Sequence, residues 1–171
     1  MMCSGKAKTG VCTDVIPVSV QALQTGAELD CIMSFKGAKL LLFLGPRLLV
    51  ILRDQKADIP FPGYWDFPGG GREGDETAQA CALRETREEV GLIVPEAAIH
   101  YSRRYPRPDG ATWFFAAEIS ARSVDDIRFG DEGQRWDLMN PDEYAAHPLG
   151  IPRFKVRLQD YLQSCRGGAS D

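Results

Sequence analysis

Three glutamates near the middle of the chain carry its clearest chemical signal. Glu85, Glu88 and Glu89 are spaced i, i+3 and i+4. Because a helix turns by about 100° per residue, the three carboxylates would share one helix face. Like charges at this spacing destabilise an isolated helix by about 0.2–0.5 kcal/mol per pair, which favours a compensating cation. Mg²⁺ is the natural candidate, since it takes carboxylate oxygens and keeps positions for water and phosphate.

The same spacing, taken alone, also fits an ordinary solvated helix face. Its neighbours decide between the two interpretations. The sequence pattern predicts a helix from about residue 76 to residue 90, with Gly91 as the C-terminal cap. Arg84 lies next to Glu85 and four residues before Glu88, so its planar guanidinium can hold a carboxylate in a fixed orientation. We therefore expect Arg84 to support the catalytic carboxylates.

A longer pattern surrounds these glutamates. It reads Gly70, five residues, Glu76, seven residues, Arg84-Glu85-Thr86, one residue, Glu88-Glu89, one residue, Gly91-Leu92. This pattern resembles the complete Nudix box, G-x5-E-x7-R-E-U-x-E-E-x-G-U. The one departure is Thr86, where the family usually has a bulky aliphatic residue; this position is predicted to face the core and not the metal. The resemblance extends from about residue 31 to residue 165.

The resemblance implies a metal-dependent hydrolase that cleaves a diphosphate bond by attack of an activated water. Mg²⁺ is the expected cofactor, with Mn²⁺ as an alternative. Glu85, Glu88 and Glu89 are implied as metal ligands, and Glu76 as a weaker or structural contributor near the start of the helix. Gly70 is implied as the residue whose missing side chain permits close packing of loop and helix.

The general base is left open by the sequence. Within the box Glu88 and Glu89 are candidates, and they compete with Glu132 in a later acidic loop, which we also consider as an added metal ligand. A solvated loop carboxylate is the alternative interpretation of Glu132.

Substrate-binding residues are signalled more weakly. Arg53 ends a predicted strand and Arg103 lies in a basic segment, so either can grip a phosphate. Trp113 lies in a predicted strand and can stack on a base. The alternatives are an exposed basic surface for the arginines and a core position for the tryptophan.

The resemblance leaves the substrate class open. We expect a MutT-like enzyme that converts a modified or surplus nucleoside triphosphate to a monophosphate and pyrophosphate. ADP-ribose and other nucleotide sugars are the alternative substrates. A Nudix-like module that binds a nucleotide without cleaving it is a third interpretation, although such a role would tolerate loss of box carboxylates and none is lost here.

Composition narrows the class of partner. Twenty basic and 24 acidic residues give a net charge of −4, which does not favour a polymeric nucleic acid. The five cysteines form no CxxC pair, which indicates reduced thiols in a cytoplasmic protein. The longest apolar stretch, residues 40–52, is interrupted and shorter than the ~20 residues of a membrane span. We expect a small nucleotide substrate and no membrane association.

The expected elements alternate between strand and helix. Strands are predicted at 15–23, 38–44, 48–53, 99–105 and 112–119, and further helices at 141–146 and 153–165. This order predicts an α+β domain, and the resemblance specifies a Nudix fold with a mixed β-sheet sandwiched between helices (α/β/α) over residues 31–171. Residues 1–30 are expected to form an N-terminal extension, either partly disordered or an edge strand that pairs across a homodimer.

Overall fold

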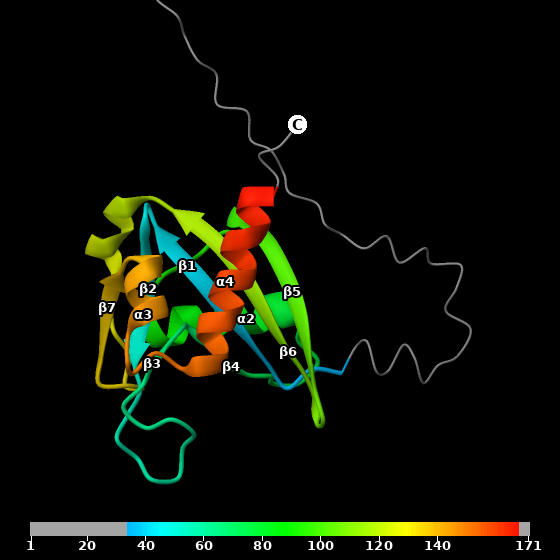
Figure 1. Cartoon of the computed structure of the whole chain (residues 1–171). Coiled ribbons are helices and arrows are strands. Elements are labelled where there is room, and N and C mark those ends of the chain that lie inside the picture. Colours follow the sequence, from blue (N-terminus) through cyan, green and yellow to red (C-terminus); the bar gives the residue numbers. More distant parts are fainter. Residues whose placement is uncertain (1–33, 168–171) are drawn as a thin grey trace, which may run out of the picture.

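A computed structural model describes residues 34–167 of the chain (Figure 1). The strands are β1 (Gly37–Leu44), β2 (Arg47–Leu52), β3 (Trp65–Asp66), β4 (Gly69–Gly71), β5 (Ile99–Arg107), β6 (Gly110–Ile119) and β7 (Arg135–Met139). The α-helices are α2 (Ala78–Val90), α3 (Pro141–Ala146) and α4 (Pro152–Gly167), and the 3-10 helices are η2 (Glu96–Ala98) and η3 (Ala121–Asp126). The described strands form one mixed sheet.

The hairpin of β1 and β2 opens away from its turn. The two strands pair only near that turn, where Phe43 lies opposite Leu48. Farther along, β4 pairs with the start of β1, and β3 pairs with the end of β2. On its other side β1 runs parallel to β6, the one parallel pairing among the described strands. The segment from β3 to β4 therefore lies between two diverging strands, and this brings its glycines to the middle of the sheet.

Helices cover both faces of this sheet (Figure 1). Because side chains alternate along a strand, β1 contributes to both interfaces. Leu40 belongs to the core cluster that contains Ala82 of α2, whereas Leu41 belongs to the cluster that contains Leu158 of α4 and Tyr144 of α3. This arrangement confirms the predicted α+β fold, with its mixed sheet between helices.

Several predicted elements are found close to their expected bounds. The hairpin at residues 38–53, the two later strands and the last two helices are present, and α2 ends at Val90 as expected. The glycines at 69–71, which lie outside every strand and helix predicted from the sequence, form β4, because β1 supplies hydrogen-bonding partners that local sequence does not reveal. Strand β7 was not predicted. Thr86 is fully buried, as expected, and its hydroxyl donates a hydrogen bond to the Ala82 carbonyl at 2.7 Å.

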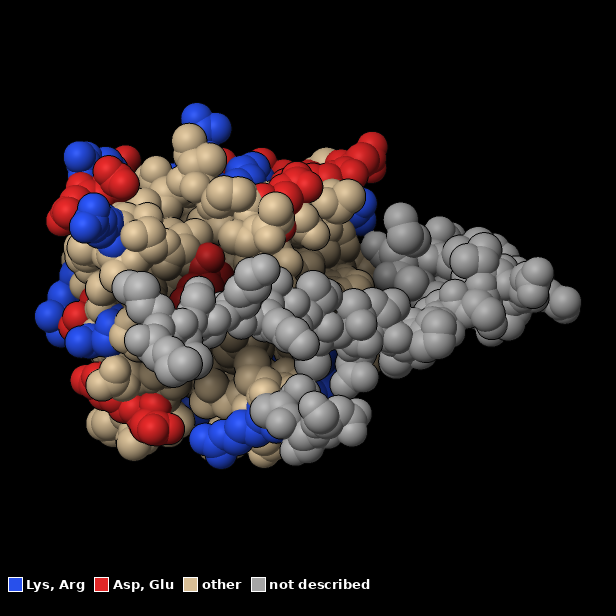
Figure 2. All heavy atoms as spheres, turned by 90° about the horizontal axis from the view of Figure 1, so that it is seen from above, with Lys and Arg blue, Asp and Glu red and all other residues tan. Residues whose placement is uncertain are grey.

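Three expectations about partners concern the charge of the surface, a membrane span and a dimer contact of the N-terminal segment. On the face shown in Figure 2, Lys and Arg side chains are interspersed with Asp and Glu. Within residues 34–167, no helix has the length and apolar character needed to span a bilayer. The strand expected at residues 15–23, and the dimer contact based on it, lie outside the described residues.

Candidate active site

Both ends of α2 are fixed by local interactions. At the start, the Thr77 hydroxyl accepts a hydrogen bond from the Ala80 amide at 3.1 Å, which satisfies one of the free N–H groups of the first turn. At the end, Gly91 adopts a φ of 72° and donates its amide hydrogen to the Arg87 carbonyl. A Cβ at Gly91 would lie 2.9 Å from the Cβ of Arg128, so this cap is closely packed as well as left-handed. The helix and its carboxylates are held in a defined register.

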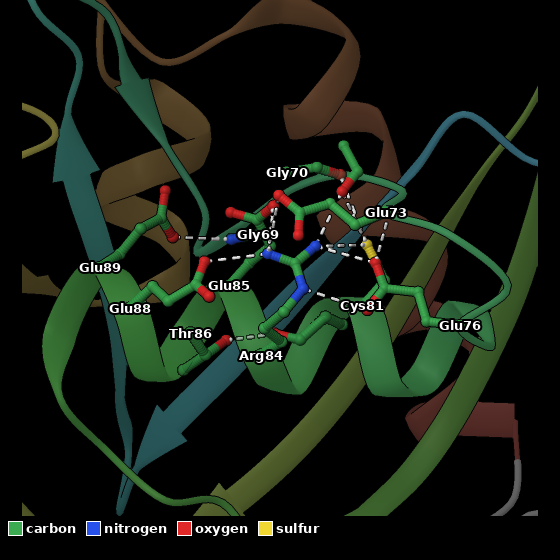
Figure 3. A network of polar contacts seen from close by, with 12 residues as sticks. Gly69, Gly70, Glu73, Glu76, Cys81, Arg84, Glu85, Thr86, Glu88 and Glu89 are labelled. Atoms are coloured by element: carbon green, nitrogen blue, oxygen red, sulfur yellow. Dashed lines mark hydrogen bonds and ion pairs between the residues drawn. The ribbon is translucent and has the colours of Figure 1, made fainter.

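Strand β4 runs directly against the carboxylate face of α2. The Gly69 amide donates a hydrogen bond to Glu89 Oε2 at 2.8 Å (Figure 3). A Cβ at Gly70 would lie 2.5 Å from the Glu85 carboxylate carbon, and a Cβ at Gly69 would collide with the Ala38 carbonyl of β1. The two glycines therefore let β4 pack between β1 and the two glutamates, which agrees with the role expected for Gly70.

Arg84 lies at the centre of the polar network in Figure 3. Its Nη1 donates to Glu85 Oε1 at 3.1 Å and to Glu88 Oε2 at 2.9 Å. Its Nη2 and Nε donate to the two carboxylate oxygens of Glu76 at 2.8 and 3.1 Å, and Nη2 also reaches the Gly71 carbonyl. The hydrogen bonds from Arg84 lower the pKa of Glu76 to about 2. Arg84 thus orients three of the box carboxylates.

Burial changes the acidity of Glu85 and Glu89. Desolvation raises the pKa of Glu89 to about 7, against the opposing effects of nearby Lys39 and the Gly69 amide. Desolvation also raises the pKa of Glu85, and the positive charge of Arg84 partly offsets it. A carboxylate with a pKa near neutrality can accept a proton under physiological conditions, which is the property of an effective general base.

The box carboxylates suit a hard divalent cation in the chemistry of their oxygen donors. Within residues 34–167, no group of three or more His, Cys, Asp or Glu side chains is arranged as a metal cluster. Glu85 and Glu88 instead share the positively charged Nη1 of Arg84. The absent side chain of Gly70 lets β4 approach the Glu85 carboxylate closely. The oxygen donors of Glu85 and Glu88 fit a divalent cation in their chemistry, and the Arg84 guanidinium lies between them in this structure.

A cavity of about 630 Å³ is lined by residues of β1, β4, α2, β5, β6 and α4. Three acidic residues line it: Glu85, Glu89 and Glu132. Six basic residues also line it: Lys36, Lys39, Arg53, Arg107, Arg153 and Arg157. An excess of cations around a few carboxylates is suited to a substrate rich in phosphate groups.

A buried aspartate positions two of these cations. Asp66 of β3 is 4% exposed, and its Oδ2 lies 3.0 Å from Lys39 Nζ and 2.8 Å from Arg53 Nη1. Lys39 Nζ also donates to the carbonyl oxygens of Phe67 and Gly69. Sequence reasoning missed Lys39 and Asp66. One signal for Lys39 was present, since it is the one charged residue within strand β1.

The predicted site residues divide into two groups. The cavity receives Glu85, Glu89, Glu132, Arg53 and Gly70. Six predicted residues do not line it: Glu76, Arg84, Glu88, Gly91, Arg103 and Trp113. Glu76 and Arg84 belong to the polar network beside it, and Gly91 caps α2.

Glu88, Arg103 and Trp113 lie outside the cavity lining. The Glu88 side chain is 58% exposed and is held by Arg84. Arg103 lies 3.7 Å from Asp160. Trp113 stacks on Phe115 at a centroid distance of 5.9 Å, beside the core cluster of α2. Because alternate residues of a strand face opposite ways, the residue between these two aromatics is the one that lines the cavity.

Comparisons with known proteins agree with this geometry. A family profile described as the NUDIX domain matches residues 35–159. The mitochondrial coenzyme A diphosphatase NUDT8 of Homo sapiens is 33% identical over 126 residues, which are 72% of this chain and 50% of that protein. The 8-oxo-dGTP diphosphatase of Proteus vulgaris is 38% identical over 47 residues, which are 28% of this chain and 42% of that protein. The chain thus spans about half the length of these two relatives or less.

A solved structure shows the same fold. The NUDIX hydrolase from Nitrosomonas europaea superposes with a TM-score of 0.62 at 23% identity, covering 77% of this chain and 72% of that one. The profile match covers most of the chain, and Glu85 and Glu89 of the box line the cavity. The chain therefore belongs to the Nudix family.

Proposed function

We propose that this protein hydrolyses a diphosphate bond in a nucleoside diphosphate linked to another group. A nucleoside triphosphate, in particular a modified one, is the leading substrate, and its products are a nucleoside monophosphate and pyrophosphate. One observation carries the proposal: the carboxylates of Glu85 and Glu89 enter a cavity whose other charged residues are mostly basic. Such a cavity binds polyphosphate and places it against the residues that assist attack by water.

The protein's own residues divide the work. Lys39 and Arg53, oriented by Asp66, bind non-bridging phosphate oxygens and offset the charge that develops on them. Mg²⁺, or Mn²⁺ in its place, would be held by Glu85, Glu88 and Glu89 and would supply charge neutralisation and a more acidic water. Phosphate binding by Lys39 and Arg53 thus adds to the metal binding that the Nudix box implies for the three glutamates.

Two cavity carboxylates can serve as general base. Glu89 is favoured, because its buried carboxylate lines the cavity and is held in place by the Gly69 amide. In this role Glu89 is not a metal ligand, and Glu85 and Glu88 would hold the cation. Glu132 lies on the cavity lining as the competitor, exposed and in the loop before β7. Glu88 is the weaker candidate, since it lies outside the lining and is bound by Arg84. Replacing Glu132 by Gln separates the first two: activity is retained if Glu89 is the base.

The charge of the cavity also bears on the substrate class. Six basic residues favour a substrate with more than two phosphates over ADP-ribose, which has only two. The likeness to an 8-oxo-dGTP diphosphatase supports the triphosphate proposal. Coenzyme A is a second candidate, supported by the longer match to a coenzyme A diphosphatase and by its additional phosphate. A binding module without turnover is disfavoured, because every charged residue of the box is present.

A product-resolved hydrolysis screen tests the proposal. The substrates are normal and oxidised nucleoside triphosphates, ADP-ribose, nucleotide sugars, dinucleoside polyphosphates and coenzyme A, each with Mg²⁺ or Mn²⁺. Glu89→Gln removes the cavity carboxylate, and Glu96→Gln is the matched control, since Glu96 is exposed in η2 and does not line the cavity.

We expect wild type and Glu96→Gln to cleave a triphosphate to monophosphate and pyrophosphate, and Glu89→Gln to lose at least about 100-fold in kcat/KM. Turnover of coenzyme A alone would replace the leading substrate by the second candidate. Stoichiometric binding of a nucleotide without turnover of any substrate would overturn the proposal in favour of a binding module.

A further inference from the structure

The basic residues of the cavity come from two different parts of the fold. Lys39 and Arg53 lie on β1 and beside β2, near the carboxylates of α2. Arg107, Arg153 and Arg157 lie at the end of β5 and in the first turns of α4. We call these three residues the arginine wall. The two groups differ in how their charges are balanced.

Near the carboxylates, charges of opposite sign are closely matched. Lys39 and Arg53 share the buried Asp66, and Glu85 and Glu89 lie on the same part of the cavity lining. Two cations thus face three carboxylates. An anionic diphosphate needs additional positive charge there, which is the part expected of a divalent metal.

On the arginine wall, positive charge is in excess. Arg107 lies 3.4 Å from Asp109, and Arg157 lies 3.8 Å from Asp160. Asp160 also lies 3.7 Å from Arg103, so its single charge is divided between two arginines. Among the described residues, Arg153 has no ion pair. The three arginines of the wall therefore have two carboxylates beside them, and one of these, Asp160, also pairs with Arg103.

Aromatic rings hold two of these guanidinium groups in place. The guanidinium of Arg153 lies over the rings of Phe61 and Phe154, 5.1 Å from each centroid. The guanidinium of Arg157 lies 3.7 Å from the centroid of Tyr105. Stacking uses the faces of a guanidinium and leaves its N–H edge available for an anion.

The positive charges of these arginines repel one another. Burial lowers the pKa of Arg153, and the neighbouring charge of Arg107 lowers it further. Phe61, which contacts Arg153, has a φ of 55°, a conformation that is rare for a bulky residue and is typical of functional sites. An anion between these side chains would remove the repulsion.

We propose that the arginine wall binds a third phosphate group of the substrate, one that lies outside the diphosphate bond being cut. The proposal rests on the proposed hydrolase function, because it needs the diphosphate to lie at Glu85 and Glu89. The third phosphate can come from two sources. It is either the terminal phosphate of a nucleoside triphosphate or a phosphate on a distant part of the molecule, as in coenzyme A.

Matched pairs of ligands test this proposal. GTP differs from GDP, and coenzyme A from dephospho-coenzyme A, by one phosphate. Binding is measured by calorimetry in EDTA, so that metal-dependent hydrolysis does not consume the ligand. The variant is Arg153→Gln, which removes the one arginine of the wall without an ion pair among the described residues. Arg166→Gln is the control, since Arg166 is exposed at the other end of α4.

Wild type and Arg166→Gln should bind the three-phosphate member of at least one pair about tenfold more tightly than its partner. Arg153→Gln should lose most of this preference while its affinity for the two-phosphate member changes by less than about twofold. A preference in the GTP pair identifies the terminal phosphate as the source, and a preference in the coenzyme A pair identifies the distant phosphate. Absence of a preference in wild type, or an equal loss for both members in Arg153→Gln, would overturn the proposal.

The same proteins are assayed for hydrolysis with Mg²⁺, so that the two proposals fail separately. If wild type binds the three-phosphate ligand more tightly but turns over no substrate, the hydrolase function is refuted and the third-phosphate site stands. Turnover without any phosphate preference would refute the third-phosphate site and leave the hydrolase function standing.

Discussion

Replacing Gly70 by alanine is the sharpest single perturbation of the proposed site. The new Cβ would lie 2.5 Å from Cδ and Oε2 of Glu85 and 2.6 Å from Oε1. Ordinary contacts between such atoms begin near 3.5 Å, so the carboxylate has to retreat by about 1 Å. A displacement of this size in a catalytic group costs on the order of 100-fold in rate. The expected loss is therefore about 100-fold in kcat/KM.

The stability of the fold should change much less. The colliding atoms are the end of a flexible side chain, which can rotate at a cost of about 0.5–1.5 kcal/mol. Gly71→Ala is the matched control, because a Cβ there meets only the Lys36 carbonyl, at 3.9 Å. The two variants are compared by kcat/KM and by urea unfolding.

We expect Gly71→Ala to keep kcat/KM within about threefold of wild type, since a Cβ at that position makes only ordinary contacts. If Gly70→Ala proved as active as Gly71→Ala, the placement of Glu85 against β4 would have no catalytic meaning. If Gly70→Ala simply failed to fold while Gly71→Ala did not, the assumption that Glu85 can rotate away would be wrong.

Three further predictions concern stability and its pH dependence. Asp66→Asn should lower the free energy of unfolding by about 2–3 kcal/mol, because it leaves two partly buried cations without their shared carboxylate. Tyr144→Phe should cost about 0.5–1.5 kcal/mol, because the buried Trp65 carbonyl loses the 3.0 Å hydrogen bond from Tyr144 and keeps the one from the Ile151 amide. The pKa of Glu76 is about 2 in the folded protein against an ordinary value of 4.5, so the stability contributed by its pairing with Arg84 is present above about pH 4.5 and lost toward pH 2. Glu76→Gln should therefore reduce the loss of stability over this range.

Urea unfolding checks each of these predictions. Wild-type stability in Asp66→Asn would show that Lys39 and Arg53 do not depend on the aspartate. For Tyr144→Phe, a change below about 0.5 kcal/mol would mean that the Ile151 amide alone satisfies the Trp65 carbonyl. For Glu76, parallel stability curves for wild type and Glu76→Gln between pH 5 and pH 2.5 would contradict the lowered pKa.

The carboxylate helix was predictable because its information is local. Helical periodicity, the capping residues and the box spacing all lie within residues 70–92. The structure places Glu85 and Glu89 at the cavity and leaves Glu88 outside its lining. The strand formed by the glycines at 69–71 was not predictable in the same way, since its stability comes from pairing with β1, about 30 residues away.

Substrate contacts depended on information that local sequence lacks. Residues 113–115 are three consecutive aromatics, so alternation cannot tell which of them faces the cavity, and an error of one position exchanges the two faces. Arg153 and Arg157 carried no distinctive local pattern. They reach the cavity only because α4 packs across the sheet near Phe114, an arrangement set by tertiary contacts.

Hydrolysis in water enriched with oxygen-18 tests the central claim most directly. The account predicts that the wild-type protein, with Mg²⁺ and a nucleoside triphosphate, incorporates one atom of the label into either the monophosphate or the pyrophosphate. Under the same conditions Glu89→Gln should release at least about 100-fold less labelled product, and Glu96→Gln should match wild type. Products without label, products other than a monophosphate and pyrophosphate, or equal rates in Glu89→Gln and wild type would contradict it.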